Sequence, residues 1–228
     1  MKRFVAALCA FALAAALPMA AFASGENDGN GDSNTGAPTV PVAPETYNEY
    51  ADLGVTTWSQ TYQAMKVPGE ADTFVFDFEA NMPGYDSLTG LKVQGVEDLT
   101  VSTVDQYDLD QYAEMVGQEK LDEYMKDLED MKATEGVELM GFLRIDAEMA
   151  DDDAIVTFYT DRNAGDIVRV MILHSDGTIT YENYEVDAQG MISFTVDGFS
   201  LFALFDVTEA PQVWRSNYVA ATSPKTGC

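Results

Sequence analysis

The residues that could carry catalysis are few in this chain. It contains one histidine, His174, and two cysteines, Cys9 and Cys228, among 228 residues. A Ser-His-Asp site would need His174 as its base, but Gly198-Phe199-Ser200 lacks the second glycine of a G-x-S-x-G elbow. Zinc sites need clusters of His and Cys, and neither a P-loop nor a G-x-G-x-x-G motif after a strand occurs. The sequence therefore predicts no catalytic residue, no cofactor and no metal site.

Carboxylates are the abundant titratable group. Asp and Glu number 39 against 12 Lys and Arg, which gives a formal net charge of -27. Paired carboxylates hydrolyse glycosides in many enzymes, but in a chain this acidic two neighbouring acids carry no signal, and we expect no enzyme. The same charge repels nucleic acid and anionic lipid, so nucleic-acid partners are excluded. Asp151-Asp152-Asp153 is interpreted as a solvated turn, with calcium binding as the alternative.

Aromatic side chains offer the other chemistry. Tyr47, Tyr50 and Trp58 precede the first strand-like run, and Trp214 follows the last. Exposed rings stack on sugar rings or on protein partners, whereas buried rings pack into a core. We interpret the Tyr47–Lys66 stretch as a short helix or extended arm packed on the domain. The alternative is a carbohydrate-binding module that uses these four aromatic residues.

The strands that would position these residues are clearest between residues 154 and 207. Residues 192–196 alternate between apolar and polar, which is typical of a strand with one buried face. Asp176-Gly177 separates two apolar runs, a strong hairpin signal because glycine tolerates a positive φ. Large apolar residues change face at Glu182–Asn183, which predicts a β-bulge there. Five short strands at regular spacing indicate an antiparallel sandwich or barrel.

The preceding part of the chain adds strands and a change of period. Apolar patterning predicts four further strands, at 71–78, 91–93, 99–104 and 137–145. Between about 107 and 132 the apolar residues follow a helical period, and Gly117 divides them, so we expect a kink or two short helices. Together these patterns predict a mainly β fold, an antiparallel, immunoglobulin-like β-sandwich at 47–208 with this one inserted, kinked α-helical segment.

The N-terminus is typical of a secretory signal peptide. A basic start at Lys2-Arg3, a short apolar run and an Ala21-Phe22-Ala23 site predict a leader at 1–23. The mature chain is therefore expected to be extracellular, with Cys228 as its remaining cysteine and without a membrane span. Residues 24–46 are acidic and Pro-rich and predict a disordered linker. Residues 209–228 are predicted to form a flexible tail.

Two segments resemble Gram-positive surface proteins. Leu173-His174, Asp176-Gly177-Thr178 and Phe199–Ala203 occur in an order similar to that of the C-terminal β-domain of actinobacterial surface proteins, over roughly residues 137–207. In such proteins the last strand precedes an LPxTG sorting signal, and the segment Ser223-Pro224-Lys225-Thr226-Gly227 is similar to that signal. The resemblance implies a surface location and supplies no catalytic residues.

The resemblance also implies a mode of attachment. Sortase would cleave between Thr226 and Gly227 and join Thr226 to peptidoglycan. Ser223 stands where the signal has Leu, and no apolar span follows Gly227, so wall attachment and release to the medium are both open. We therefore predict a secreted, non-catalytic structural or adhesive module of a Gram-positive cell surface. Cell-wall peptidoglycan, or a surface glycan or protein, is the expected partner.

Overall fold

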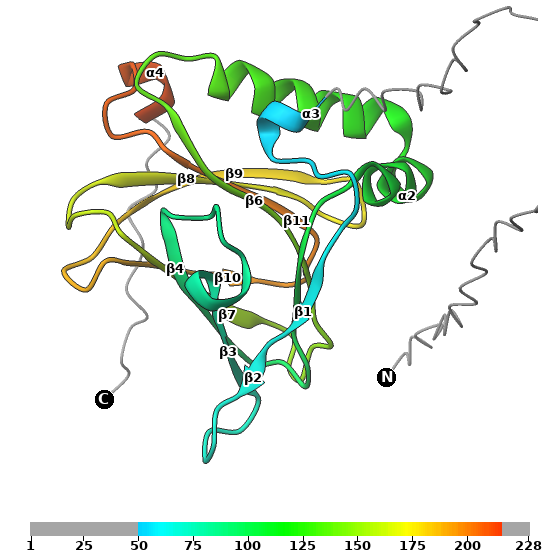
Figure 1. Ribbon diagram of the computed structural model, residues 1–228, viewed down its shortest axis with the longest axis vertical. Coiled ribbons are helices and arrows are strands. Elements are labelled where there is room, and N and C mark those ends of the chain that lie inside the picture. The colour runs from blue at the N-terminus through cyan, green and yellow to red at the C-terminus, as the bar shows by residue number, and fades with distance from the viewer. Residues whose placement is uncertain (1–49, 216–228) are drawn as a thin grey trace, which may run out of the picture. The chain divides into compact units, whose positions relative to one another are not determined.

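Two antiparallel sheets form the framework of the described chain. The computed structural model describes residues 50–215, so the predicted leader, the linker, Tyr47, the SPKTG motif and Cys228 lie outside the described residues. Within this range the sheets contain six and five strands (Figure 1). The six-stranded sheet runs, in spatial order, β1 (Thr61–Gln63), β5 (Thr100–Thr103), β6 (Glu138–Asp146), β11 (Leu201–Asp206), β8 (Ile167–Leu173) and β9 (Ile179–Glu185). The five-stranded sheet runs β10 (Met191–Val196), β7 (Ala154–Thr160), β4 (Leu88–Gln94), β3 (Thr73–Asp77) and β2 (Met65–Lys66).

The main core lies between the two sheets. Most strands place alternate residues in this core, where aromatic rings of the five-stranded sheet and α1 (Phe78–Asn81) gather. The ring centroid of Phe158 lies 6.5 Å from that of Phe78 and 6.2 Å from that of Phe194. Burying such rings is the largest favourable term available to a chain that has to fold against its own negative charge. The predicted mainly β, antiparallel sandwich is confirmed.

Two helices cover the outer face of the six-stranded sheet. Figure 1 shows α2 (Gln106–Val116) and α3 (Gln118–Lys132) above β6, β8 and β9. The predicted inserted helical segment is confirmed, and Gly117, with φ +94°, separates the two helices. Tyr124 of α3 is fully buried, and its hydroxyl donates to the Met171 carbonyl oxygen at 3.2 Å. The six-stranded sheet is therefore buried on both faces.

The predicted β-bulge at Glu182–Asn183 is wrong. The pairing of β9 with β8 runs unbroken from Ile167 opposite Glu185 to Leu173 opposite Ile179. Tyr181 packs under the helices, whereas Tyr184 packs into the core between the sheets. Both faces of β9 meet apolar surroundings, so large residues can change face without any change in register.

The N-terminal arm joins both sheets. After the 3₁₀ helix η1 (Ala51–Leu53), the chain is extended and supplies β1 to one sheet and β2 to the other. This agrees with the expected short helix or extended arm. A second short segment, α1 (Phe78–Asn81), follows β3, and its first turn is capped by Asp77, whose carboxylate accepts from the Ala80 amide at 2.9 Å.

The packed part of the chain continues beyond residue 208, where the sequence placed the start of a flexible tail. Ala210 is buried, and α4 (Gln212–Arg215) follows it. The Trp214 carbonyl oxygen accepts hydrogen bonds from Asn183 at 2.8 Å and from Arg169 at 3.2 Å. These bonds fix the end of the described chain to β8 and β9.

Candidate ligand cleft

A cleft of about 660 Å³ opens where the N-terminal arm, the loop after α1 and β6 meet. It exists because β5 is shorter than its neighbour. β5 pairs with β6 only from Leu143 to Asp146, and then the chain turns away into α2. The cleft is lined by Leu53, Gly54, Thr56, Thr57, Trp58, Gln60, Tyr62, Met82, Pro83, Gly84, Tyr85, Thr103, Leu139, Met140, Gly141 and Phe142.

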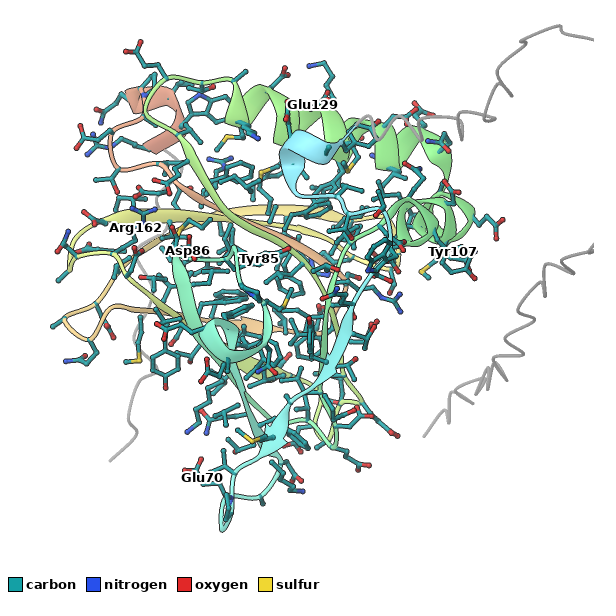
Figure 2. The ribbon with its side chains drawn as sticks, viewed as in Figure 1. Glu70, Tyr85, Asp86, Tyr107, Glu129 and Arg162 are labelled. Carbon is teal, nitrogen blue, oxygen red and sulfur yellow. The ribbon has the colours of Figure 1, made fainter. Side chains whose placement is uncertain are left out.

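The floor of the cleft depends on a close contact between β6 and Tyr85. Gly141 lies beside a bulge at which β6 carries one residue more than β11. A Cβ atom at Gly141 would lie only 3.0 Å from Cδ1 of Tyr85 and 2.8 Å from Cδ1 of Leu88. Glycine therefore lets the Tyr85 ring lie against the strand, and the ring points inward in Figure 2.

The Tyr85 hydroxyl also supplies a hydrogen-bond donor to a backbone carbonyl in the cleft floor. Its hydroxyl donates to the Phe142 carbonyl oxygen at 2.9 Å, on the side of β6 that β5 leaves open. Its ring stacks on Phe78 with centroids 6.1 Å apart. Burial raises the pKa of the Tyr85 phenol to about 12, so this group stays protonated and donates its hydrogen bond at all physiological pH values.

Trp58 forms the opposite wall and is 67% exposed. The backbone that carries it is held on both sides. The Thr56 hydroxyl donates to the Trp58 carbonyl oxygen at 2.7 Å, and the Ser59 amide donates to Oδ2 of Asp105 at 2.6 Å. The Gln60 amide donates to Oγ1 of Thr103 at 2.9 Å. A large ring is thus displayed to solvent from a bend whose backbone is held by hydrogen bonds.

The cleft is electrically neutral. None of the described residues that line it is Asp, Glu, Lys, Arg or His, although the chain as a whole has a net charge of -27. The polar side-chain groups of its lining residues are hydroxyls, the Gln60 amide and the Trp58 indole N–H, which form hydrogen bonds without charge. Such a lining suits a neutral ligand that offers both apolar faces and hydroxyl groups.

The three predicted stacking aromatics that the structure describes do not form one surface. Trp58 lines the cleft, whereas Tyr50 packs against the core beneath the helices. Trp214 is also partly buried, with the guanidinium of Arg169 lying 5.5 Å from its ring centroid. Tyr47 lies outside the described residues. Sequence reasoning missed Tyr85 as a site residue. Tyr85 and Gly141 are far apart in the sequence, and only the folding of the chain brings the Tyr85 ring beside Gly141.

A second, smaller cleft of about 410 Å³ lies at the seam between β9 and β10. It contains the predicted structural histidine, His174, whose Nε2 lies 2.9 Å from Oγ1 of Thr180. Its acidic lining residues are Asp153, Asp176, Glu182 and Asp197. Across residues 50–215 no group of three His, Cys, Asp or Glu side chains is placed to hold a metal ion.

Comparisons of the chain with protein-family models, with curated proteins and with solved structures found no match. Within the part of the chain that the structure describes, no helix is long and apolar enough to cross a membrane. The chemistry of the neutral cleft is therefore the basis for a functional proposal.

Proposed function

We propose that this chain is a secreted, non-catalytic adhesive module of a Gram-positive cell surface, and that it binds a neutral carbohydrate in the Trp58 cleft. The observation that carries the proposal is an uncharged cleft with a 67% exposed tryptophan as its wall. The predicted leader at 1–23, and the resemblance of residues 137–207 and 223–227 to surface proteins, support the location. A glycan of the cell wall or of a partner surface would supply the ligand.

A sugar ring fits this lining for two physical reasons. Its apolar face stacks on an aromatic ring, and its hydroxyl groups need hydrogen-bond partners of both kinds. Trp58 supplies the ring, while Thr56, Thr57 and Gln60 lie on the same segment and supply polar groups. Because their backbone is already fixed, little conformational entropy is lost when a ligand binds.

The composition of the cleft also supports binding without turnover. General acid–base catalysis near neutral pH uses His, Asp, Glu, Lys or Cys within hydrogen-bond reach of the substrate. The described residues that line the cleft include none of these. The buried phenol of Tyr85, with a pKa of about 12, is a weak acid that already donates to the Phe142 carbonyl oxygen.

The test is an NMR titration of the secreted chain with neutral and charged oligosaccharides, in wild type and two variants. Trp58→Ala removes the ring, and Tyr107→Ala is the matched control because Tyr107 is also 67% exposed and lies on α2, outside the cleft lining (Figure 2). We expect a neutral oligosaccharide to shift the Trp58 indole signal and Trp58→Ala to weaken binding about tenfold or more. Tyr107→Ala should bind as wild type does.

Two results would contradict the proposal. One is that no neutral oligosaccharide of the panel shifts the signals of cleft residues. The other is that a glycan is cleaved in the sample, which would place the chain among enzymes.

A further inference from the structure

The carboxylate of Asp105 lies where the arm, β5 and α2 meet. Asp105 lies two residues after the end of β5, immediately before α2, and is only 8% exposed. Its two oxygens serve two different elements. Oδ1 accepts from the Asp108 amide at 2.9 Å in the first turn of α2, and Oδ2 accepts from the Ser59 amide at 2.6 Å, next to Trp58.

The helix cap alone does not explain an aspartate here. Asp105 and Asp108 form a capping box, in which the Asp108 carboxylate accepts from the Asp105 amide at 3.1 Å. One side-chain oxygen is enough for such a cap, and serine caps as well as aspartate does. Compared with serine, aspartate has a second side-chain oxygen, and here that oxygen accepts a hydrogen bond from the arm.

The capping box of α2 is in turn bonded to β6, the strand that contributes to the cleft floor. Oδ1 of Asp108 accepts from Nη1 of Arg144 on β6 at 2.6 Å, and Asp108 is 2% exposed. From Ser59, the neighbour of Trp58 in the chain, hydrogen bonds of 2.6–3.1 Å therefore lead through Asp105 and Asp108 to Arg144, and those between Asp105 and Asp108 are buried. Charged groups make the stronger bonds of this kind, particularly where water is excluded.

We propose that Asp105 is a positioning residue that couples the capped state of α2 to the orientation of Trp58. The inference rests on the proposed function only in taking Trp58 as the wall that meets ligand. Coupling of two equilibria is reciprocal. Ligand held against Trp58 therefore stabilises the first turn of α2, and loss of the second oxygen of Asp105 weakens ligand binding although Asp105 does not line the cleft.

Substitutions can separate the two roles of the carboxylate. Asp105→Ser keeps one oxygen for the cap and removes the one that holds the arm. Ser59→Pro removes the amide donor of the arm and leaves Asp105 intact. Asp105→Ala removes both roles.

The deciding measurement is ¹⁵N relaxation of the Trp58 amide and indole, with the Trp214 signals as an internal control. In Asp105→Ser and in Ser59→Pro we expect the order parameter of Trp58 to fall from about 0.85 to below about 0.6, while Trp214 is unchanged. Amide exchange at Asp108 should quicken most in Asp105→Ala, about fivefold as expected for loss of a cap, and less in the two separating variants, which keep the cap and lose its coupling to the arm. A rigid Trp58 in both separating variants overturns the proposal.

The coupling itself is measured with cellohexaose as a neutral probe. In Asp105→Ser its dissociation constant should rise about three- to tenfold, the cost of ordering a free side chain on binding. In wild type the probe should slow exchange of the Asp108 amide, and exchange that is unaffected by bound probe contradicts the coupling. The relaxation experiment needs no ligand, so a failure of sugar binding would overturn the proposed function while the positioning role is decided separately.

Discussion

The two clefts of this sandwich differ in how their chemistry arises. The Trp58 cleft is uncharged and lies where β5 ends before its neighbour β6 does. The cleft at the β9–β10 seam has four carboxylates in its lining and lies where the edge strands of different sheets face each other. Size alone, about 660 Å³ against about 410 Å³, does not decide which of them binds a ligand.

Turn chemistry explains at least one of the four seam carboxylates. Asp176 lies in the β8–β9 turn, and its carboxylate accepts from the Thr178 amide at 2.8 Å. Asp197 likewise precedes a glycine in the turn after β10. Aspartate is favoured at such positions because it bonds its own backbone two residues on. Asp176 therefore has a local structural cause and does not by itself point to a ligand.

The aromatic residues of the two clefts also differ in their roles. In the seam, Tyr184 and Phe194 stack on each other with centroids 5.0 Å apart, as part of the core between the sheets. In the neutral cleft, Trp58 is 67% exposed, although three hydrogen bonds hold the backbone of residues 58–60. A ring that is displayed at a fixed position, without a packing role, is the feature that favours binding.

The largest expected loss of stability comes from adding a methyl group at Gly141 in the cleft floor. Gly141→Ala would push Tyr85 and Leu88 away from β6, and we expect it to lower the free energy of unfolding by about 2–3 kcal/mol, as overpacking does. The matched control lies near the seam: a Cβ at Gly198 meets no atom within 4 Å. Gly198→Ala should change stability by less than about 1 kcal/mol and in the stabilising direction. Urea unfolding of both variants measures the difference, and equal losses would show that the two regions are packed alike.

A smaller effect is expected from removing one hydroxyl group in each cleft. Tyr85→Phe leaves the buried Phe142 carbonyl without its partner, and we expect a loss of about 1–1.5 kcal/mol. Tyr184→Phe removes a hydroxyl that donates to the partly exposed Glu182 carboxylate, which water can replace, so the loss should stay within about 0.5 kcal/mol. Urea unfolding at pH 7 compares them. A larger loss for Tyr184→Phe would reverse the contrast between a structured neutral floor and a solvated acidic seam.

The sheet and helix elements followed from local pattern, but register did not. On β9 the apolar residues change face and yet the pairing is regular. On β6 the pattern from 137 to 145 looks regular, yet a bulge at Met140 shifts the pairing with β11. Both strands belong to the sheet that is covered on both faces, so an apolar residue finds apolar surroundings in either phase. Alternation of apolar and polar residues identifies register only where one face of the strand is exposed to solvent.

The candidate site was predictable only in part, for a related reason. Trp58 was singled out because tryptophan is large and lies outside the strand ladder. Its cleft, however, is assembled from the arm, the loop at 82–85, Thr103 and residues 139–142, and no spacing in the sequence relates these segments. Trp214 looked equivalent to Trp58 in the sequence, but Arg169 and Asn183 hold its carbonyl oxygen and keep it partly buried.

The smallest expected effect concerns pH, and it tests whether the two clefts are electrostatically independent. Hydrogen bonds from the Thr178 amide and hydroxyl lower the pKa of Asp176. A carboxyl group whose pKa is lowered by folding adds stability above its unfolded pKa, near 3.9, and this contribution is lost as the pH falls through the folded value. Asp176→Asn should therefore lower the melting temperature by about 1 °C at pH 6, and the two curves should converge once the pH is below the folded pKa of Asp176.

Over pH 5 to 8 the neutral cleft should behave differently from the seam. No described residue in its lining is Asp, Glu or His, and the pKa of Tyr85 is about 12. The affinity for a neutral oligosaccharide should therefore be constant in wild type and unchanged in Asp176→Asn, as measured by the Trp58 signal in NMR titrations. An affinity that titrates in this range, and loses that dependence in Asp176→Asn, would show that the acidic seam acts on the ligand. The carboxylates there would then need a functional explanation in addition to the turns that they form.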